Sequence, residues 1–170
     1  MNIVFVGARG SGKSIVAKAV SRRLGRGVAS TDAEIVKKAG VPVSEYVAEN
    51  GWDAFRDLET SVVLDLANGD DLVVDTGGGV VLRPENVAAL KRKGYVIWLR
   101  TSIETLKSRL ADATDRPSLT GTKSFVEEME EILAVRAPIY ESVADCIIDT
   151  DRRSVDEIAA LIEERIRQAL

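Results

Sequence analysis

Short apolar runs alternate along the chain with longer stretches in which apolar residues recur at helical spacing. The apolar runs are rich in β-branched residues, as expected for buried strands, and cover residues 3–6, 28–30, 72–74, 95–99 and 146–148. The helical stretches cover residues 13–24, 32–39, 43–50, 52–67, 84–93, 102–110, 125–143 and 154–169. Strands that alternate with helices predict an α/β fold, in which two helical layers enclose a mainly parallel sheet.

The composition fits one globular domain that spans residues 1–170. Hydrophobic residues make up 45% of the chain, which is enough for a full core. The net charge of −4 argues against a nucleic-acid partner, because such partners usually require a basic surface. No apolar run approaches the ~18 residues of a membrane span, and no signal peptide is visible. We therefore expect a cytoplasmic protein that binds neither nucleic acid nor membrane, with a size compatible with a monomer.

Two residue types narrow the chemistry further. Cys146 is the single cysteine, which rules out an internal disulfide and fits a reducing compartment. Histidine is absent, which excludes a His-based triad, a His metal site and an imidazole base. Any proton transfer must therefore depend on a carboxylate, a lysine or the substrate.

Residues 7–14 match the phosphate-loop pattern G-x-x-x-x-G-K-[ST], between an expected strand and an expected helix. Glycines allow a tight nest of backbone N–H groups against phosphate oxygens. Lys13 offers a cation to the β- and γ-phosphates, and Ser14 offers a hydroxyl to Mg²⁺. The pattern predicts that a nucleoside triphosphate binds with Mg²⁺ through Gly7, Ala8, Arg9, Gly10, Ser11, Gly12, Lys13, Ser14 and Ile15.

Three further features lie where parallel strands are expected to end, which is where ligands bind in open α/β sheets. Asp75 follows an apolar strand and either holds Mg²⁺ beside Ser14 or caps a turn. The glycines 77–79 either let the backbone approach a ligand closely or form a flexible turn. Asp32 can accept a hydroxyl proton as a base, can cap the next helix, or can do both.

Three arginines complete the pattern, although any one of them alone would be read as a solvated surface residue. Arg56 lies on an expected helix, three residues before Glu59, which can hold it through a salt bridge. Arg116 lies in the polar segment 113–124, which we expect to form a lid. Arg136 opens Arg-Ala-Pro-Ile-Tyr near the end of the chain.

The order of these motifs resembles shikimate kinase over nearly the whole chain. The resemblance rests on the phosphate loop 7–14, Thr31-Asp32, Phe55-Arg56 with Glu59, the glycines 77–79, Arg116-Pro117 and residues 136–140. It implies a P-loop NTPase fold of the nucleoside-monophosphate-kinase type, with a five-stranded parallel sheet in the order 2-3-1-4-5. It also implies a phosphotransferase of aromatic amino acid biosynthesis, which moves the γ-phosphoryl group of ATP to the 3-hydroxyl of shikimate.

The resemblance also assigns roles to single residues. It implies that a helical segment near residues 32–60 binds shikimate, and that Asp32 binds the shikimate hydroxyls and acts as the base. The other residues that it places against shikimate are Arg56 and Arg136, which bind the carboxylate, with Gly78 and Gly79. The residues that it adds to the phosphate loop on the nucleotide side are Arg109 and Arg153, near the adenine, and the lid arginine Arg116. Lys13, Asp32 and Arg116 would thus be catalytic.

One departure from the family lies at the end of the second strand. The family usually has Asp-x-Asp there, whereas this chain has Ser30-Thr31-Asp32, so an acid that helps to hold Mg²⁺ is missing. Asp75 stands where the family often has a small residue, and we expect its carboxylate to replace the missing one, opposite Ser14. Two alternatives stay open: another small-molecule kinase with a phosphate loop, and a kinase-like sensor without turnover, which Ser30 alone supports.

Overall fold

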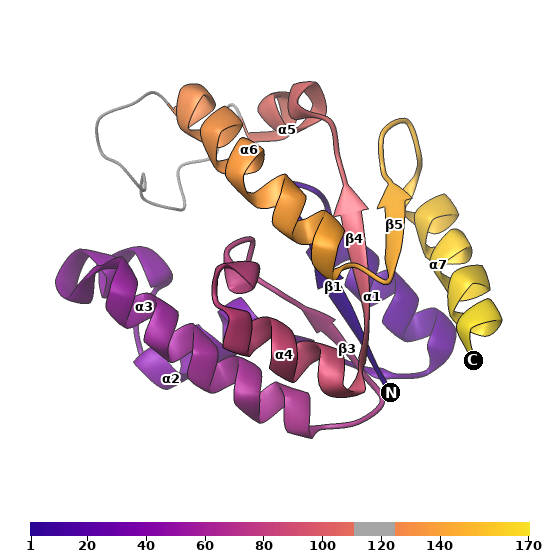
Figure 1. The fold of residues 1–170 in the computed structure, drawn as a ribbon, viewed down its shortest axis with the longest axis horizontal. Coiled ribbons are helices and arrows are strands. Elements are labelled where there is room, and N and C mark those ends of the chain that lie inside the picture. Colours follow the sequence, from indigo (N-terminus) through magenta and orange to yellow (C-terminus); the bar gives the residue numbers. More distant parts are fainter. Residues whose placement is uncertain (111–124) are drawn as a thin grey trace.

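The described residues form a five-stranded sheet in which every strand pair is parallel (Figure 1). The computed structural model describes residues 1–110 and 125–170. The strands are β1 (Asn2–Val6), β2 (Gly27–Ser30), β3 (Leu72–Asp75), β4 (Gly94–Arg100) and β5 (Cys146–Asp149), in the spatial order β2-β3-β1-β4-β5. The predicted fold class and strand order are confirmed.

The helices follow the predicted boundaries to within one residue, apart from one merged pair. They are α1 (Lys13–Leu24), α2 (Thr31–Ala39), α3 (Val43–Asn68), α4 (Pro84–Lys93), α5 (Ile103–Leu110), α6 (Phe125–Val143) and α7 (Val155–Ala169), with the short 3₁₀ helix η1 (Val80–Leu82). The sequence predicts two helices where α3 runs. Their expected junction is visible at Gly51, whose φ of 84° and ψ of 170° interrupt the helical backbone at a position that glycine tolerates.

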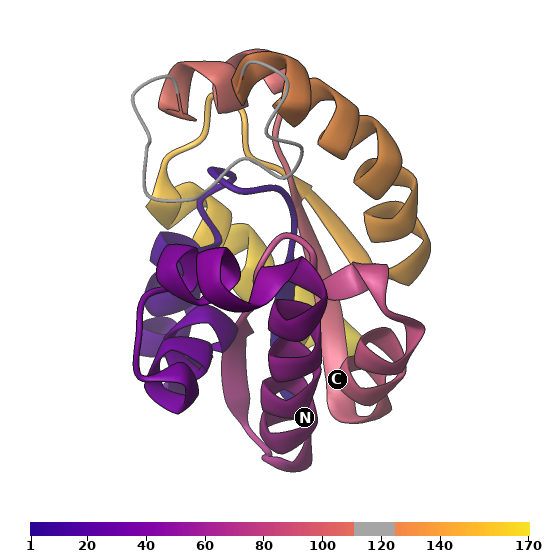
Figure 2. The ribbon, with the colours of Figure 1, turned by 90° about the vertical axis from the view of Figure 1, so that its left-hand side faces the viewer.

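Helices cover both faces of the sheet (Figures 1 and 2). On one face, Ile3 and Phe5 of β1 join an apolar core with α1 and α7. On the other face, Val4 and Val6 join a second core with α3, α4 and α6. Because successive strand residues point to opposite faces, β1 must be apolar throughout to serve both cores. This explains why the sequence shows a continuous apolar run there and no alternation.

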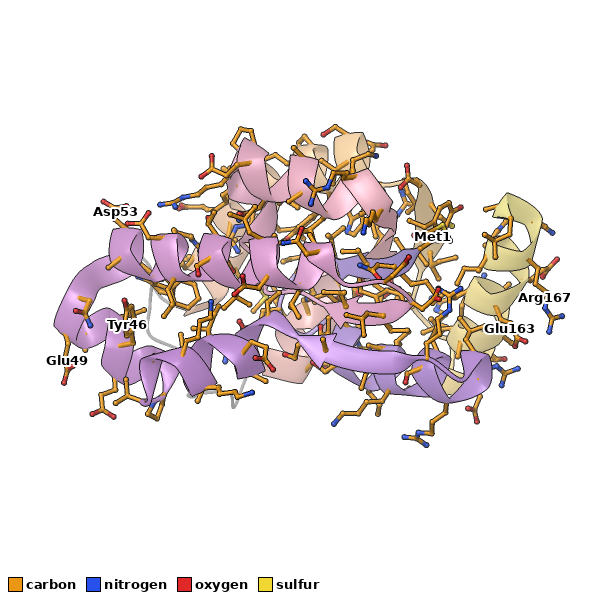
Figure 3. All side chains as sticks on the ribbon, turned by 90° about the horizontal axis from the view of Figure 1, so that it is seen from below. Met1, Tyr46, Glu49, Asp53, Glu163 and Arg167 are labelled. Atoms are coloured by element: carbon orange, nitrogen blue, oxygen red, sulfur yellow. The ribbon has the colours of Figure 1, made fainter. Side chains whose placement is uncertain are left out.

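The helices α2 and α3 carry a smaller apolar cluster of their own. It consists of Ile35, Val47, Phe55 and Val62. Figure 3 shows the outer end of α3, marked by Tyr46, Glu49 and Asp53, at the opposite side of the molecule from Glu163 and Arg167 of α7. Surface variants on α7 therefore provide controls that lie far from α3. Among the described residues, no helix is long and apolar enough to cross a bilayer.

The connections after β1, β2 and β3 meet at one edge of the sheet, because parallel strands end on the same side. The chain first builds β2 and β3 on one side of β1, and then builds β4 and β5 on the other side. This reversal leaves a crevice beyond the carboxyl end of β1, which is where open α/β sheets bind their ligands.

Candidate active site

A cavity of about 390 Å³ opens at this edge of the sheet. Its walls come from the loop after β1, the ends of β2 and β3, and the first turns of α1 and α2. The residues that line it are Arg9, Gly10, Gly12, Lys13, Ser14, Ile15, Ser30, Asp32, Asp75, Thr76, Gly77 and Gly78. The structure thus brings together the phosphate loop, both predicted acids and the glycine segment.

The phosphate loop closes around its own lysine. Lys13 is 7% exposed, and its Nζ donates hydrogen bonds to the carbonyl oxygens of Gly7 and Ala8 at 2.8 and 2.9 Å. A Cβ at Gly7 would lie 2.8 Å from the carbonyl oxygen of Leu99, so the loop passes too close to β4 for a side chain. Helix α1 begins at Lys13 with no acidic residue in its first turn. Its free N–H groups and its dipole therefore favour a bound anion.

Ser14 and Asp75 place two oxygen atoms side by side next to the loop. The Ser14 hydroxyl donates to Oδ2 of Asp75 at 2.5 Å. Burial raises the pKa of the Asp75 carboxyl, while the bond from Ser14 and the charge of Lys13 oppose the rise. In the sheet register, Asp75 is the direct partner of Ser30, whose hydroxyl accepts from the Ala33 N–H and caps α2. This strand pair therefore carries one acid, on β3.

The first glycine of the segment after β3 faces two carboxylates. A Cβ at Gly77 would lie 3.1 Å from Oδ1 of Asp32 and 3.1 Å from Oε2 of Glu59. The N–H of Gly77 donates to the hydroxyl of Thr31 at 2.9 Å, and Thr31 is fully buried at the start of α2. Because Thr31 precedes Asp32, this bond also fixes where Asp32 enters the cavity.

The next two glycines face arginines. A Cβ at Gly78 would lie 3.4 Å from Nη1 of Arg136, and a Cβ at Gly79 would overlap the guanidinium of Arg56. Glycines 77–79 all have negative φ, and the φ of −93° and ψ of 4° at Gly79 are open to alanine. At Gly79 the site therefore needs glycine because it lacks a side chain, and no unusual backbone conformation is involved there.

Arg56 is held by three neighbours on its own helix. Its Nη1 donates to Oε1 of Glu59 at 3.0 Å, and Glu59 is fully buried. Its Cζ lies 5.4 Å from the ring centroid of Trp52 and 5.2 Å from that of Phe55, within the range of cation–π contacts. The predicted salt bridge between Arg56 and Glu59 is thereby confirmed.

Arg136 approaches the same place from α6. Burial lowers the pKa of its guanidinium, and the charge of Arg56 acts in the same direction, while Tyr140 and Glu59 oppose the shift. Two guanidinium groups are thus close enough to repel each other. A bound anion with two oxygen atoms would relieve that repulsion, because each guanidinium can pair with a carboxylate.

The cavity lining does not include four of the predicted arginines: Arg56, Arg109, Arg136 and Arg153. Arg109 of α5 donates from Nη1 to the carbonyl oxygen of Gly10 at 2.9 Å and so reaches the phosphate loop. Arg153 is exposed in the turn after β5. Arg116 and the expected lid, residues 113–124, lie outside the described residues. In the part of the chain that the structure describes, no three acidic or thiol side chains gather as a metal site.

Two side chains that belong to the sequence motifs, but to which the sequence assigns no role of their own, hold the glycine segment in place. They are Thr31, through the bond to Gly77, and Tyr140, whose hydroxyl donates to the carbonyl oxygen of Gly78. Tyr140 follows Arg136 by four residues, so helical spacing already puts both on one face of α6. The partner of a buried hydroxyl, in contrast, can be read only from the three-dimensional structure.

Comparisons with known proteins agree with this geometry. A sequence model of the shikimate kinase family matches residues 9–167. The chain is 40% identical to the shikimate kinase of Nitratidesulfovibrio vulgaris, with 94% of each chain covered, and 41% identical to that of Symbiobacterium thermophilum, with 99% of this chain and 97% of the relative covered.

Comparison with solved structures leads to the same family. Shikimate kinase from Acinetobacter baumannii in complex with shikimate matches with a TM-score of 0.93 at 31% identity, over 99% of this chain and 93% of that chain. The enzyme from Aquifex aeolicus matches with a TM-score of 0.87 at 27% identity, over 100% of this chain and 99% of that chain. A phosphate loop, an acid and paired arginines on one glycine segment, together with these matches over the whole length, show that the chain belongs to the shikimate kinase family.

Proposed function

We propose that this chain transfers the γ-phosphoryl group of ATP to the 3-hydroxyl of shikimate, and that the transfer takes place in the cavity at the sheet edge. One observation carries the proposal: an acid and two arginines face three successive glycines beside a phosphate loop. Shikimate has one carboxylate and several hydroxyl groups. It therefore needs cations at one end and a hydrogen-bond acceptor at the other, and the site offers both.

Arg56 and Arg136 bind the shikimate carboxylate in this proposal. They come from different helices, α3 and α6, and both reach the glycine segment. Each guanidinium can donate two parallel hydrogen bonds, which fixes the orientation of the ligand as well as its affinity. Gly78 and Gly79 leave the space in which the two guanidinium groups and the ligand meet.

Asp32 accepts the proton of the attacking hydroxyl and orients the shikimate ring that carries it. Its carboxylate lines the cavity together with Lys13, so the hydroxyl that it holds lies on the side of the phosphate loop. Lys13 stabilises the negative charge that develops on the transferred group. The enzyme thus works by positioning and by charge, as phosphoryl transfer requires.

The nucleotide is bound by residues 7–15, with Arg109 beside Gly10. The roles of Arg116 at the transferred phosphate and of Arg153 at the adenine stay predictions, as does the lid in the single domain 1–170. We also propose that the enzyme is a monomer. Light scattering at assay concentration would test that point.

Mg²⁺ fits the residues that lie beside the loop. This ion prefers oxygen ligands, keeps several waters and takes only one or two ligands from the protein next to substrate phosphates. Adjacent ligands in its shell lie about 2.9 Å apart, and the oxygens of Ser14 and Asp75 lie 2.5 Å apart. We propose that these two residues would hold the ion, which would offset the negative charge of the phosphates.

A swap of the acid between neighbouring strands tests this metal site. Asp75→Ala should weaken Mn²⁺ binding in the presence of ADP by roughly 10- to 100-fold, followed by the electron paramagnetic resonance signal of free Mn²⁺. Ser30→Asp added to Asp75→Ala should restore most of the affinity, because residues 30 and 75 are register partners. If Asp75→Ala binds Mn²⁺ normally, Asp75 is not a ligand; if the swap fails to restore affinity, the two positions are not equivalent.

The reaction itself is tested by ADP release from MgATP, with and without shikimate. We expect release that depends on shikimate and that falls by roughly 10²- to 10⁴-fold in Asp32→Asn. Arg167→Ala, on the distant helix α7, is the control that should behave like the parent (Figure 3). Release with a different acceptor would favour another small-molecule kinase. Tight ATP binding with no release for any acceptor would favour a sensor.

A further inference from the structure

We propose that Tyr140 is a positioning residue of the shikimate site, because its hydroxyl fixes helix α6 to Gly78 and thereby sets where the Arg136 guanidinium lies. This inference rests on the proposed function, in which Arg136 binds the shikimate carboxylate. Tyr140 itself is not expected to touch the substrate. Its effect would pass through the two residues that it places.

The hydroxyl of Tyr140 is not needed to fill the core. The side chain is fully buried, and its ring packs in the apolar core 5.7 Å from the ring of Trp98, at an interplanar angle of 37°, while its hydroxyl end lies close to Arg136. A phenylalanine ring would fill the same space. A hydroxyl group in such a place is costly unless it forms a hydrogen bond, and this one donates to the carbonyl oxygen of Gly78. Burial raises the pKa of Tyr140 to about 12, so the group stays a donor at every physiological pH.

Gly78 is the point at which Tyr140 and Arg136 meet. The two residues lie one helical turn apart on α6, so their side chains leave the helix in the same direction. Arg136 passes 3.4 Å from the Cβ position of Gly78, on whose carbonyl oxygen the Tyr140 hydroxyl rests. Without that bond, helix α6 keeps its apolar packing but loses its hydrogen bond to the glycine segment, so the position of Arg136 is less firmly set.

The glycine segment is held from the other side by Thr31. The N–H of Gly77 donates to the Thr31 hydroxyl, and Thr31 immediately precedes Asp32. One backbone segment therefore links the helix that carries the acid to the helix that carries Arg136. The phosphate loop has its own internal bonds, from Lys13 to two carbonyl oxygens. Loss of the Tyr140 hydroxyl should therefore weaken the binding of shikimate and leave the binding of ATP unchanged.

The experiment compares Tyr140→Phe with Tyr95→Phe. Tyr95 lies in the half of β4 away from the cavity and is half-buried, so its variant removes a phenol hydroxyl without touching the site. We expect Tyr140→Phe to raise the Kd of shikimate in calorimetry, and its KM, by roughly five- to tenfold. The KM of ATP should stay within about twofold of the parent, since a merely structural defect would move both. Tyr95→Phe should change neither value.

A double-mutant cycle with Arg136→Ala shows whether Tyr140 acts through Arg136. If it does, Tyr140→Phe adds little to the loss that Arg136→Ala already causes. Effects on shikimate Kd that multiply, or a Tyr140→Phe enzyme with the parent Kd, would overturn the inference and leave the role of Arg136 intact. An Arg136→Ala enzyme that binds shikimate normally would instead overturn the proposed role of Arg136, and the inference with it.

Discussion

Replacement of Gly79 by alanine adds one methyl group at the place where the structure has least room for it. The φ of −93° and ψ of 4° at Gly79 are open to alanine, so the backbone itself is not strained. The new Cβ would lie closest to Nη2 of Arg56 and 2.5 Å from its Nη1, whereas ordinary contacts begin near 3.4 Å. The guanidinium must therefore retreat by at least about 0.9 Å, the difference between those two distances.

The displacement of Arg56 should weaken shikimate binding by an amount that can be estimated. Arg56 is held at 3.0 Å by Glu59 and is flanked by the rings of Trp52 and Phe55, so a displacement of the guanidinium disturbs these contacts. Hydrogen bonds to a charged group contribute about 1.5–3 kcal/mol, which corresponds to roughly 10- to 100-fold in affinity. A misplacement of about 1 Å is known to cost a similar factor in enzymes. We expect shikimate affinity to fall by that range.

The stability of the fold should change much less. Alanine restricts the unfolded chain more than glycine does, which contributes about 0.4–1 kcal/mol in favour of folding and offsets part of the crowding at Arg56. Calorimetric Kd for shikimate, KM for both substrates and Tm would separate the two effects. Gly27→Ala is the matched control, because its Cβ would meet only the side chain of Leu72, at 3.3 Å. A Gly79→Ala enzyme with normal Tm and shikimate Kd within twofold would refute the reasoning.

Three other predictions concern stability. Because burial raises the pKa of Tyr140 from 10.0 to about 12, the folded state favours the neutral phenol. The free energy of unfolding of the parent, relative to that of Tyr140→Phe, should therefore fall by about 2–3 kcal/mol between pH 10 and 12, as measured by urea titration. A difference that grows with pH would contradict this. Ile162 is a fully buried core residue on α7. Ile162→Ala should lower the free energy of unfolding by about 2–5 kcal/mol, and a loss below about 1 kcal/mol would refute the packing. Ser154→Ala removes the capping box with Glu157 and should lower stability by about 1 kcal/mol, a loss that Ser154→Asp should not show.

The parts of this structure that the sequence predicts best are those determined by neighbours along the chain. The phosphate loop is one of them, because its glycines, Lys13 and Ser14 act within a single turn. The strand boundaries are another, because the apolar runs are short and end at polar residues. The salt bridge from Arg56 to Glu59 was also predictable, since i,i+3 spacing on a helix puts both on one face.

Contacts between distant segments could not be obtained in the same way. Arg56 and Gly79 are separated by a helix and a strand, so nothing in their local sequence shows that they would collide if Gly79 carried a side chain. The sequence suggested that glycines 77–79 serve to let the backbone approach a ligand. Their negative φ values and charged neighbours show an additional physical reason, which is room for side chains from α2, α3 and α6, while the approach to a ligand stays a prediction. The resemblance to shikimate kinase implied which residues bind the substrate, and the structure shows which side chains lie beside the glycines.

The proposed metal site and the glycine segment differ in which substitutions they tolerate. Neighbouring strands lie about 4.8 Å apart, so an aspartate at position 30 or at its register partner 75 stays beside the loop in either case. An acid can therefore move from one strand to its neighbour without leaving the proposed metal site. The glycines have no such equivalent, because each of them faces a different charged group. Exchange of Ser30 and Asp75 should thus be tolerated because the two residues are register partners, whereas exchange of Gly79 for alanine should not be, because the new Cβ would overlap the guanidinium of Arg56.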